Sequence, residues 1–85
     1  MKVVVYAICK NEEQFADRWM DSMQEADQVV VLDTGSSDGT VERLRARGAL
    51  VEQEIITPWR FDAARNRSLE LVPEDADLCV CTDLD

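Results

Sequence analysis

Two carboxylates that flank a single leucine, Asp83 and Asp85, are the residues of this sequence best suited to chemistry. They follow the apolar run 78–81, and no helix-forming segment comes after them, so a preference for helix starts does not explain them. One or two carboxylates together with substrate phosphates are the usual ligands of Mg²⁺ in proteins. The pair therefore predicts a Mg²⁺ or Mn²⁺ site with Asp83 and Asp85 as metal ligands.

Other acidic side chains follow the remaining apolar runs. Asp33 ends the run 29–32 and opens the Gly/Ser-rich segment 34–40, whereas Glu12 and Glu13 follow the first run. Acidic residues are favoured at helix N-termini, which accounts for Glu12 and Glu13 but not for Asp33. Asp33 is therefore a further candidate for ligand binding.

Charge and missing residue types exclude several classes of function. The 85 residues carry 9 Lys+Arg against 18 Asp+Glu, a net charge of −9, and no histidine. This charge disfavours nucleic acid as a partner, because non-specific binding depends on neutralising phosphates. Without imidazole, Ser-His triads, Cys-His dyads and His-ligated zinc sites are excluded. A bound divalent cation would invert the local charge and so allow an anionic nucleotide to bind.

The cysteines and the apolar runs indicate a cytoplasmic protein. Cys9, Cys79 and Cys81 show neither a disulfide framework nor metal-site spacing, and we expect them to be buried, reduced side chains. No apolar run approaches the length of a membrane span. The N-terminus has no long apolar stretch or cleavage site of a signal peptide.

The apolar pattern predicts strands that alternate with helices. Continuous apolar runs at 3–8, 29–32 and 78–81, with a weaker one at 49–51, are typical of strands covered on both faces. Phe15, Trp19 and Met23 recur at helical spacing, and two further helical segments lie between the later runs.

Capping residues mark the predicted helix ends. Asn11 with the acidic residues after it is typical of an N-cap with a capping box. Asp38 and Asp62 are placed to cap the second and third helices, and Gly48 to end the second in the left-handed conformation.

Alternating strands and helices indicate an α/β fold. We expect a Rossmann-like parallel four-stranded sheet of order 3-2-1-4 with helices on both faces, joined by right-handed crossovers. Because nothing covers the last strand, residues 1–85 are expected to be a single, truncated portion of a larger domain. The fourth strand, 78–82, would then lie at an open edge and could mediate self-association.

Four segments in order resemble family 2 glycosyltransferases, which have the GT-A fold. They read KNEE at 10–13, VLDTGSSDGT at 31–40, WRFDAARNRSL at 59–69 and TDLD at 82–85, and they spread over the whole chain. The resemblance implies the nucleotide-sugar-binding half of an incomplete GT-A domain. Family members transfer a sugar from a nucleotide-diphosphate sugar with inversion.

The resemblance also implies roles for single residues. Asp33 would hydrogen-bond the base, Glu12 would face the ribose or base, Arg65 would reach toward the nucleotide, Asp83 would contact the ribose, and Asp85 would ligate the metal. The general base and the acceptor site would lie beyond Asp85, so no catalytic residue is expected in this chain. A UDP-sugar is the expected donor.

Trp59 and Phe61 are expected to be core aromatics beneath the third helix.

Three other readings compete. Residues 33–37, DTGSS, match the aspartic-protease signature, but a charged helical segment at 40–47, the lack of flap glycines and the alternation of strands with helices oppose it. Nucleotidyltransferases have a similar sheet but usually carry a Gly-rich basic loop where this chain has KNEE. A third interpretation is a fragment that folds without turning over substrate.

Overall fold

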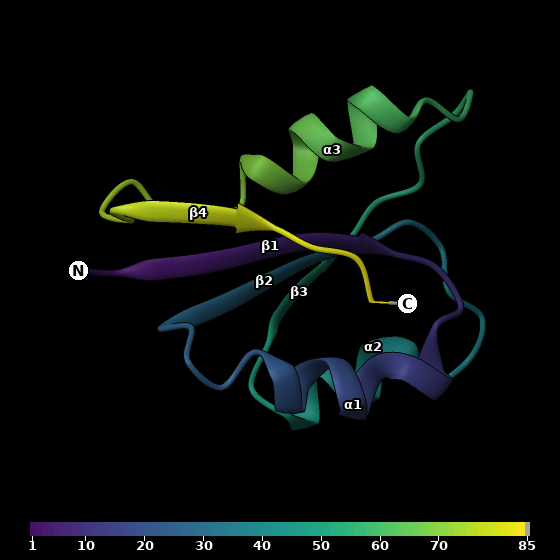
Figure 1. The fold of residues 1–85 in the computed structure, drawn as a ribbon. Coiled ribbons are helices and arrows are strands. Elements are labelled where there is room, and N and C mark those ends of the chain that lie inside the picture. The colour runs from purple at the N-terminus through teal and green to yellow at the C-terminus, as the bar shows by residue number, and fades with distance from the viewer. Residues whose placement is uncertain (85) are drawn as a thin grey trace.

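The computed structural model describes residues 1–84, and within them strands and helices alternate strictly (Figure 1). The elements are β1 (Val3–Cys9), α1 (Glu13–Ser22), β2 (Gln28–Asp33), α2 (Thr40–Ala46), β3 (Leu50–Gln53), α3 (Phe61–Leu69) and β4 (Leu78–Cys81). This order confirms the one that the apolar pattern predicts.

The four strands form one parallel sheet of order β3-β2-β1-β4. The predicted α/β architecture is therefore confirmed. Helices α1 and α2 lie together on one face of the sheet, and α3 lies on the other (Figure 1). Because β1 and β2 are central and covered on both faces, their sequences are continuous apolar runs.

The core lies mainly between the sheet and the pair α1 and α2. Trp19 of α1 and Leu44 of α2 are buried there with Val31 of β2. Successive residues of a strand point to opposite faces, so Val30 and Leu32, both 0% exposed, point toward the α3 side. Each central strand thus contributes apolar side chains to both layers.

Two of the predicted helix starts are wrong. Helix α1 begins at Glu13 with Glu12 as its N-cap, whereas Asn11 has φ of 52° and lies outside the helix. Asparagine tolerates this left-handed conformation better than most residues do. Helix α3 begins at Phe61, before Asp62, whose carboxylate pairs with the Arg60 guanidinium at 3.1 Å.

The predicted ends of α2 are closer to the structure. The backbone N–H of Thr40, its first residue, donates to Asp38 Oδ1 at 3.0 Å, although Gly39 occupies the N-cap. Gly48 follows the helix with φ of 97°, as expected for a left-handed helix end.

The fourth strand is not covered on both faces as its apolar run predicts. Leu78, Cys79 and Val80 are exposed, because α3 packs over β1 and β2 and β4 lies at the edge of the sheet. The expectation of buried cysteines holds for Cys9, fails for exposed Cys79, and is met only partly by half-buried Cys81.

Candidate functional site

The segments that follow β1 and β2 are hydrogen-bonded to each other. The N–H of Asn11 donates to Ser36 Oγ at 2.8 Å, and the N–H of Ser37 donates to Asn11 Oδ1 at 2.7 Å. Asn11 makes both contacts with its backbone in the left-handed conformation. Asn11 therefore fixes the position of the second segment and does not cap a helix.

The same two segments meet again at the starts of α1 and α2. The N–H of Glu12 donates to Thr40 Oγ1 at 2.9 Å, and the N–H of Gly39 donates to Glu13 Oε1 at 3.1 Å. A Cβ at position 39 would lie 2.8 Å from Glu13 Oε2, so glycine permits this close approach. The KNEE and DTGSSDGT stretches are thus hydrogen-bonded into one unit. Polar residues dominate both because these bonds need side-chain donors and acceptors.

Ion pairs that the sequence reasoning missed extend this unit along α1 and α2. Arg43 Nε lies 3.0 Å from Glu13 Oε2, and its Nη1 lies 3.0 Å from Asp17 Oδ2. Arg47 pairs with Asp17 and Asp21. The signal was a spacing of four on both helices, acidic on α1 and basic on α2.

The ion pairs change the acidity of Glu13. The pKa of Glu13 is lowered, first by the hydrogen bond from Arg43 and then by the N–H of Gly39. Glu13 is therefore charged at neutral pH and bound to α2. This contact explains Glu13 without a ligand.

Asp33 is fully buried at the end of β2, where its own loop closes over it. Its Oδ2 accepts the N–H groups of Ser36 at 3.0 Å and Gly35 at 3.3 Å. Its Oδ1 accepts the hydroxyl of Ser36 and the thiol of Cys9. Burial, and next the Asp33 charge, raise the pKa of the Cys9 thiol far above its usual range. Asp33 thus holds the turn 34–36 in place.

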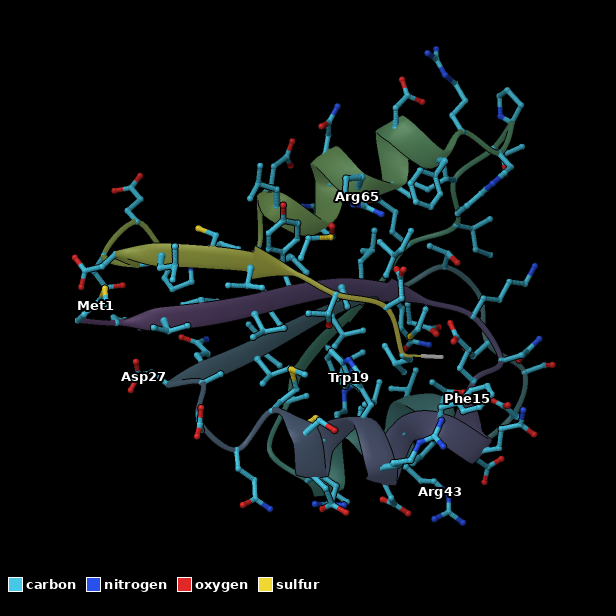
Figure 2. The ribbon with its side chains drawn as sticks, in the orientation of Figure 1. Met1, Phe15, Trp19, Asp27, Arg43 and Arg65 are labelled. Atoms are coloured by element: carbon cyan, nitrogen blue, oxygen red, sulfur yellow. The ribbon has the colours of Figure 1, made fainter. Side chains whose placement is uncertain are left out.

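Arg65, the predicted nucleotide contact, belongs to helix α3 (Figure 2). Its guanidinium lies 4.7 Å from the centroid of the Phe61 ring, and its Nε is buried without a hydrogen-bond partner among residues 1–84. A buried donor without an acceptor is costly, so a ligand oxygen would be a favourable partner. Phe61 and Trp59 are 54% and 55% exposed, so the expectation that they are core aromatics is wrong.

Trp59 borders a cavity at the carboxyl ends of β1, β2 and β3. The cavity has a volume of about 460 Å³ and is lined by Lys10, Thr34, Ile55, Ile56, Thr57 and Trp59. Its lining combines apolar side chains with two hydroxyls and one ammonium group. Such a mixture suits a flat heterocycle attached to an anionic group.

Asp83 follows β4 and is exposed. The residues on either side of it are fixed: the Thr82 N–H donates to the Tyr6 carbonyl at 3.2 Å, and Leu84 is 3% exposed. Asp85, the predicted metal ligand, lies outside the described residues. Among residues 1–84, no group of three or more histidine, cysteine or acidic side chains could hold a metal ion.

The sheet topology places three of the predicted site residues at the carboxyl ends of neighbouring strands. Because β2, β1 and β4 are parallel neighbours, the carboxyl ends of three adjacent strands carry Asp33 at the end of β2, Glu12 after β1 and Asp83 after β4. Arg65 belongs to the helix on the opposite face from α1 (Figure 1). In open parallel sheets, ligands bind at the carboxyl ends of the strands.

Solved structures share this fold over almost the whole chain. Glucosyl-3-phosphoglycerate synthase from Mycobacterium tuberculosis, in complex with Mn²⁺, UDP-glucose and phosphoglyceric acid, superposes with a TM-score of 0.81 and 29% identity over 99% of this chain. The chain has the fold of part of a GT-A glycosyltransferase domain.

Further complexes of the same synthase superpose equally well. The complex with Mg²⁺ and UDP gives a TM-score of 0.81, and the complex with UDP gives 0.82, both at 29% identity and over 99% of this chain. The chain spans about a third of the length of these structures. No protein-family model and no curated protein sequence matches it.

The GT-A architecture rules out the aspartic-protease interpretation of residues 33–37. Those residues lead into helix α2 and a parallel sheet, whereas such proteases are nearly all β. None of the helices in residues 1–84 has the length and apolar character needed to cross a membrane.

Proposed function

We propose that this chain is the donor-binding part of a metal-dependent glycosyltransferase that uses a nucleotide-diphosphate sugar. The observation that carries the proposal is the placement of Asp33, Glu12 and Asp83 at three adjacent strand ends in a GT-A sheet. The similarity to a synthase solved with UDP-glucose supports a UDP-sugar as the donor.

The nucleoside would occupy the cavity beside Trp59. An exposed indole offers a face for base stacking, and Lys10 offers a positive charge to the phosphates. Glu12 would face the ribose or base. The unpartnered Arg65 Nε supports its assignment as a donor to the nucleotide.

Asp33 has a more demanding role in this proposal. Both of its carboxylate oxygens already accept hydrogen bonds, and the residue is fully buried. A base N–H therefore reaches Asp33 only if the turn formed by Gly35 and Ser36 opens. In the closed turn, Asp33 serves the site by holding residues 34–36.

The residues present fit a divalent cation. We propose Asp85 and Asp83 as its protein ligands, with Asp83 also near the ribose, because carboxylates suit Mg²⁺ and Mn²⁺ and diphosphate oxygens would complete the shell. The cation would stabilise the charge that develops on the departing diphosphate. It would also offset the net charge of −9 that otherwise repels the donor.

Membership of family 2 would give inversion at the anomeric centre, with a carboxylate base outside this chain. The anomeric configuration of the product, measured by NMR, tests this point. Release of a nucleoside diphosphate and not pyrophosphate would separate a glycosyltransferase from a nucleotidyltransferase.

Isothermal titration of the intact protein with UDP and UDP-glucose tests the proposal, with Mn²⁺ and with EDTA. Asp85→Ala should abolish the metal-dependent part of binding, and Glu25→Gln, at an exposed acidic position, should not. If Asp85→Ala leaves metal-dependent binding intact, the metal assignment is wrong. Titrations with the other nucleoside diphosphates then identify the base that the protein binds most tightly.

A further inference from the structure

A hydrogen bond joins helix α1 to the segment that carries Asp83. The indole Nε1–H of Trp19 donates to Thr82 Oγ1 at 2.9 Å, across 63 residues of sequence. Trp19 is 5% exposed and lies between α1 and the sheet (Figure 2). Its ring is a rigid body within the core, so the position of its N–H is fixed by packing.

The segment after β4 is held on both sides of Asp83. Thr82 is bound through its N–H to the Tyr6 carbonyl and through its hydroxyl to Trp19. Leu84 is buried in the same core cluster as Trp19. Asp83 between them is exposed. The alternation of burial from 82 to 84 directs the carboxylate away from the core.

We propose that Trp19 is a positioning residue for Asp83, acting through Thr82. This inference rests on the proposed function, because it assigns the contact to the metal and diphosphate site. Groups that orient metal ligands without touching the metal commonly alter its affinity. Strand β4 has four residues and lies at the sheet edge, so its backbone bonds alone restrain the segment weakly.

The physical reason is entropic. Without the Trp19 contact, residues 82–84 would have more backbone freedom, and a ligand would have to order them as it binds. A segment that is already fixed binds more tightly because that cost falls on folding and not on binding. The contact therefore contributes to metal affinity although Trp19 never touches the metal.

The test uses five forms of the intact protein: wild type, Thr82→Val, Thr82→Ser, Trp19→Phe and the double variant with Trp19→Phe and Thr82→Val. Valine removes the acceptor at nearly constant shape, serine restores a hydroxyl, and phenylalanine removes the donor but keeps an aromatic ring. Mn²⁺ affinity in the presence of UDP is measured by EPR of the free ion. Hydrogen exchange of the residue 82 amide, which donates to the Tyr6 carbonyl, is measured without any ligand.

We expect Thr82→Val and Trp19→Phe to weaken Mn²⁺ binding about tenfold and to speed amide exchange at residue 82. Thr82→Ser should behave as wild type. The double variant should be no worse than either single one, because both remove the same bond. If Trp19→Phe does not fold, the comparison of Thr82→Val with Thr82→Ser still decides.

Unchanged Mn²⁺ affinity and unchanged exchange in Thr82→Val would overturn the inference. A wild-type protein that binds neither Mn²⁺ nor UDP would instead refute the proposed function. In that case the exchange measurement decides alone: faster exchange of the residue 82 amide in Thr82→Val supports the positioning contact, and equal exchange refutes it.

Discussion

Asn11 Oδ1 accepts the N–H of Ser37 at 2.7 Å, so one amide side chain joins the ends of two neighbouring strands. The bond links residues 26 positions apart and places the KNEE stretch against the Gly/Ser-rich segment. Two substitutions of Asn11 can separate the free energy lost with this hydrogen bond from the free energy lost through backbone strain.

Substitution of Asn11 should reveal two contributions. Asn11→Gly keeps the left-handed backbone but loses the side-chain bonds, and we expect a loss of about 1 kcal/mol in the free energy of unfolding. Asn11→Ala loses the bonds and also strains φ of 52°, which adds about 1 kcal/mol. Urea denaturation of both variants measures the difference. Equal stability of the two would show that the backbone contributes nothing.

Acid should weaken the contact between α1 and α2. The folded pKa of Glu13 is lowered by Arg43 and Gly39, so its stabilising effect is present at neutral pH and lost as pH falls through the folded pKa. We expect the free energy of unfolding to begin falling below about pH 5. Glu13→Gln should flatten this slope, and 1 M NaCl should reduce it because the pairs are exposed. A slope that Glu13→Gln leaves unchanged would assign it to other carboxylates.

Asp33 should matter for stability before any ligand is added. Asp33→Asn keeps one oxygen for the N–H groups of Ser36 and Gly35, but it removes the charge and turns an NH₂ toward the Cys9 thiol and the Ser36 hydroxyl, which we expect to cost about 2 kcal/mol. Asp83→Asn is the matched control, because Asp83 is exposed and its substitution should leave stability within about 0.5 kcal/mol. Thermal unfolding without nucleotide distinguishes the two. If Asp33→Asn leaves thermal stability unchanged, Asp33 does not hold the loop 34–36 in place.

The three thiols should differ in reactivity. Cys79 is exposed, Cys81 is half-buried, and Cys9 is buried with a raised pKa. Iodoacetamide at pH 8 should therefore modify Cys79 first and leave Cys9 unmodified until the protein is unfolded. Peptide mass spectrometry identifies the modified sites. Rapid labelling of Cys9 in the folded protein would contradict the position of β1 in the core.

Residues 1–85 on their own should self-associate through β4. The strand lies at the sheet edge with Leu78 and Val80 exposed, and such edges pair with other chains. Val80→Lys should reduce the association, since edge lysines oppose strand pairing. Light scattering over a concentration series measures the effect. A monomer at all concentrations would argue against it.

The element order and sheet topology could be predicted because they follow from local patterns. Central strands buried on both faces must be apolar throughout, and right-handed crossovers then restrict the strand order. The wrong helix start at Asn11 has a different cause. Asparagine is suited both to an N-cap and to a left-handed turn, and the distant partners Ser36 and Ser37 decide between them.

Several site features depend on contacts that no local pattern contains. Trp19 looks like an ordinary core residue of α1, and its bond to Thr82 appears only when β4 is placed beside β1. Trp59 and Phe61 were expected in the core because they are large and apolar, but they are exposed where α3 begins. Hydrophobicity alone does not distinguish a core side chain from an exposed one.

The bonds between the segments after β1 and β2 also matter for protein engineering. A chimaera that exchanges only residues 34–40 would separate Asn11 from Ser37 and the N–H of Glu12 from Thr40. The two segments are therefore one unit of exchange, although β2 and α1 lie between them in the sequence. Crossover points that keep both on the same parent, before β1 or after α2, preserve the edge on which a donor would sit.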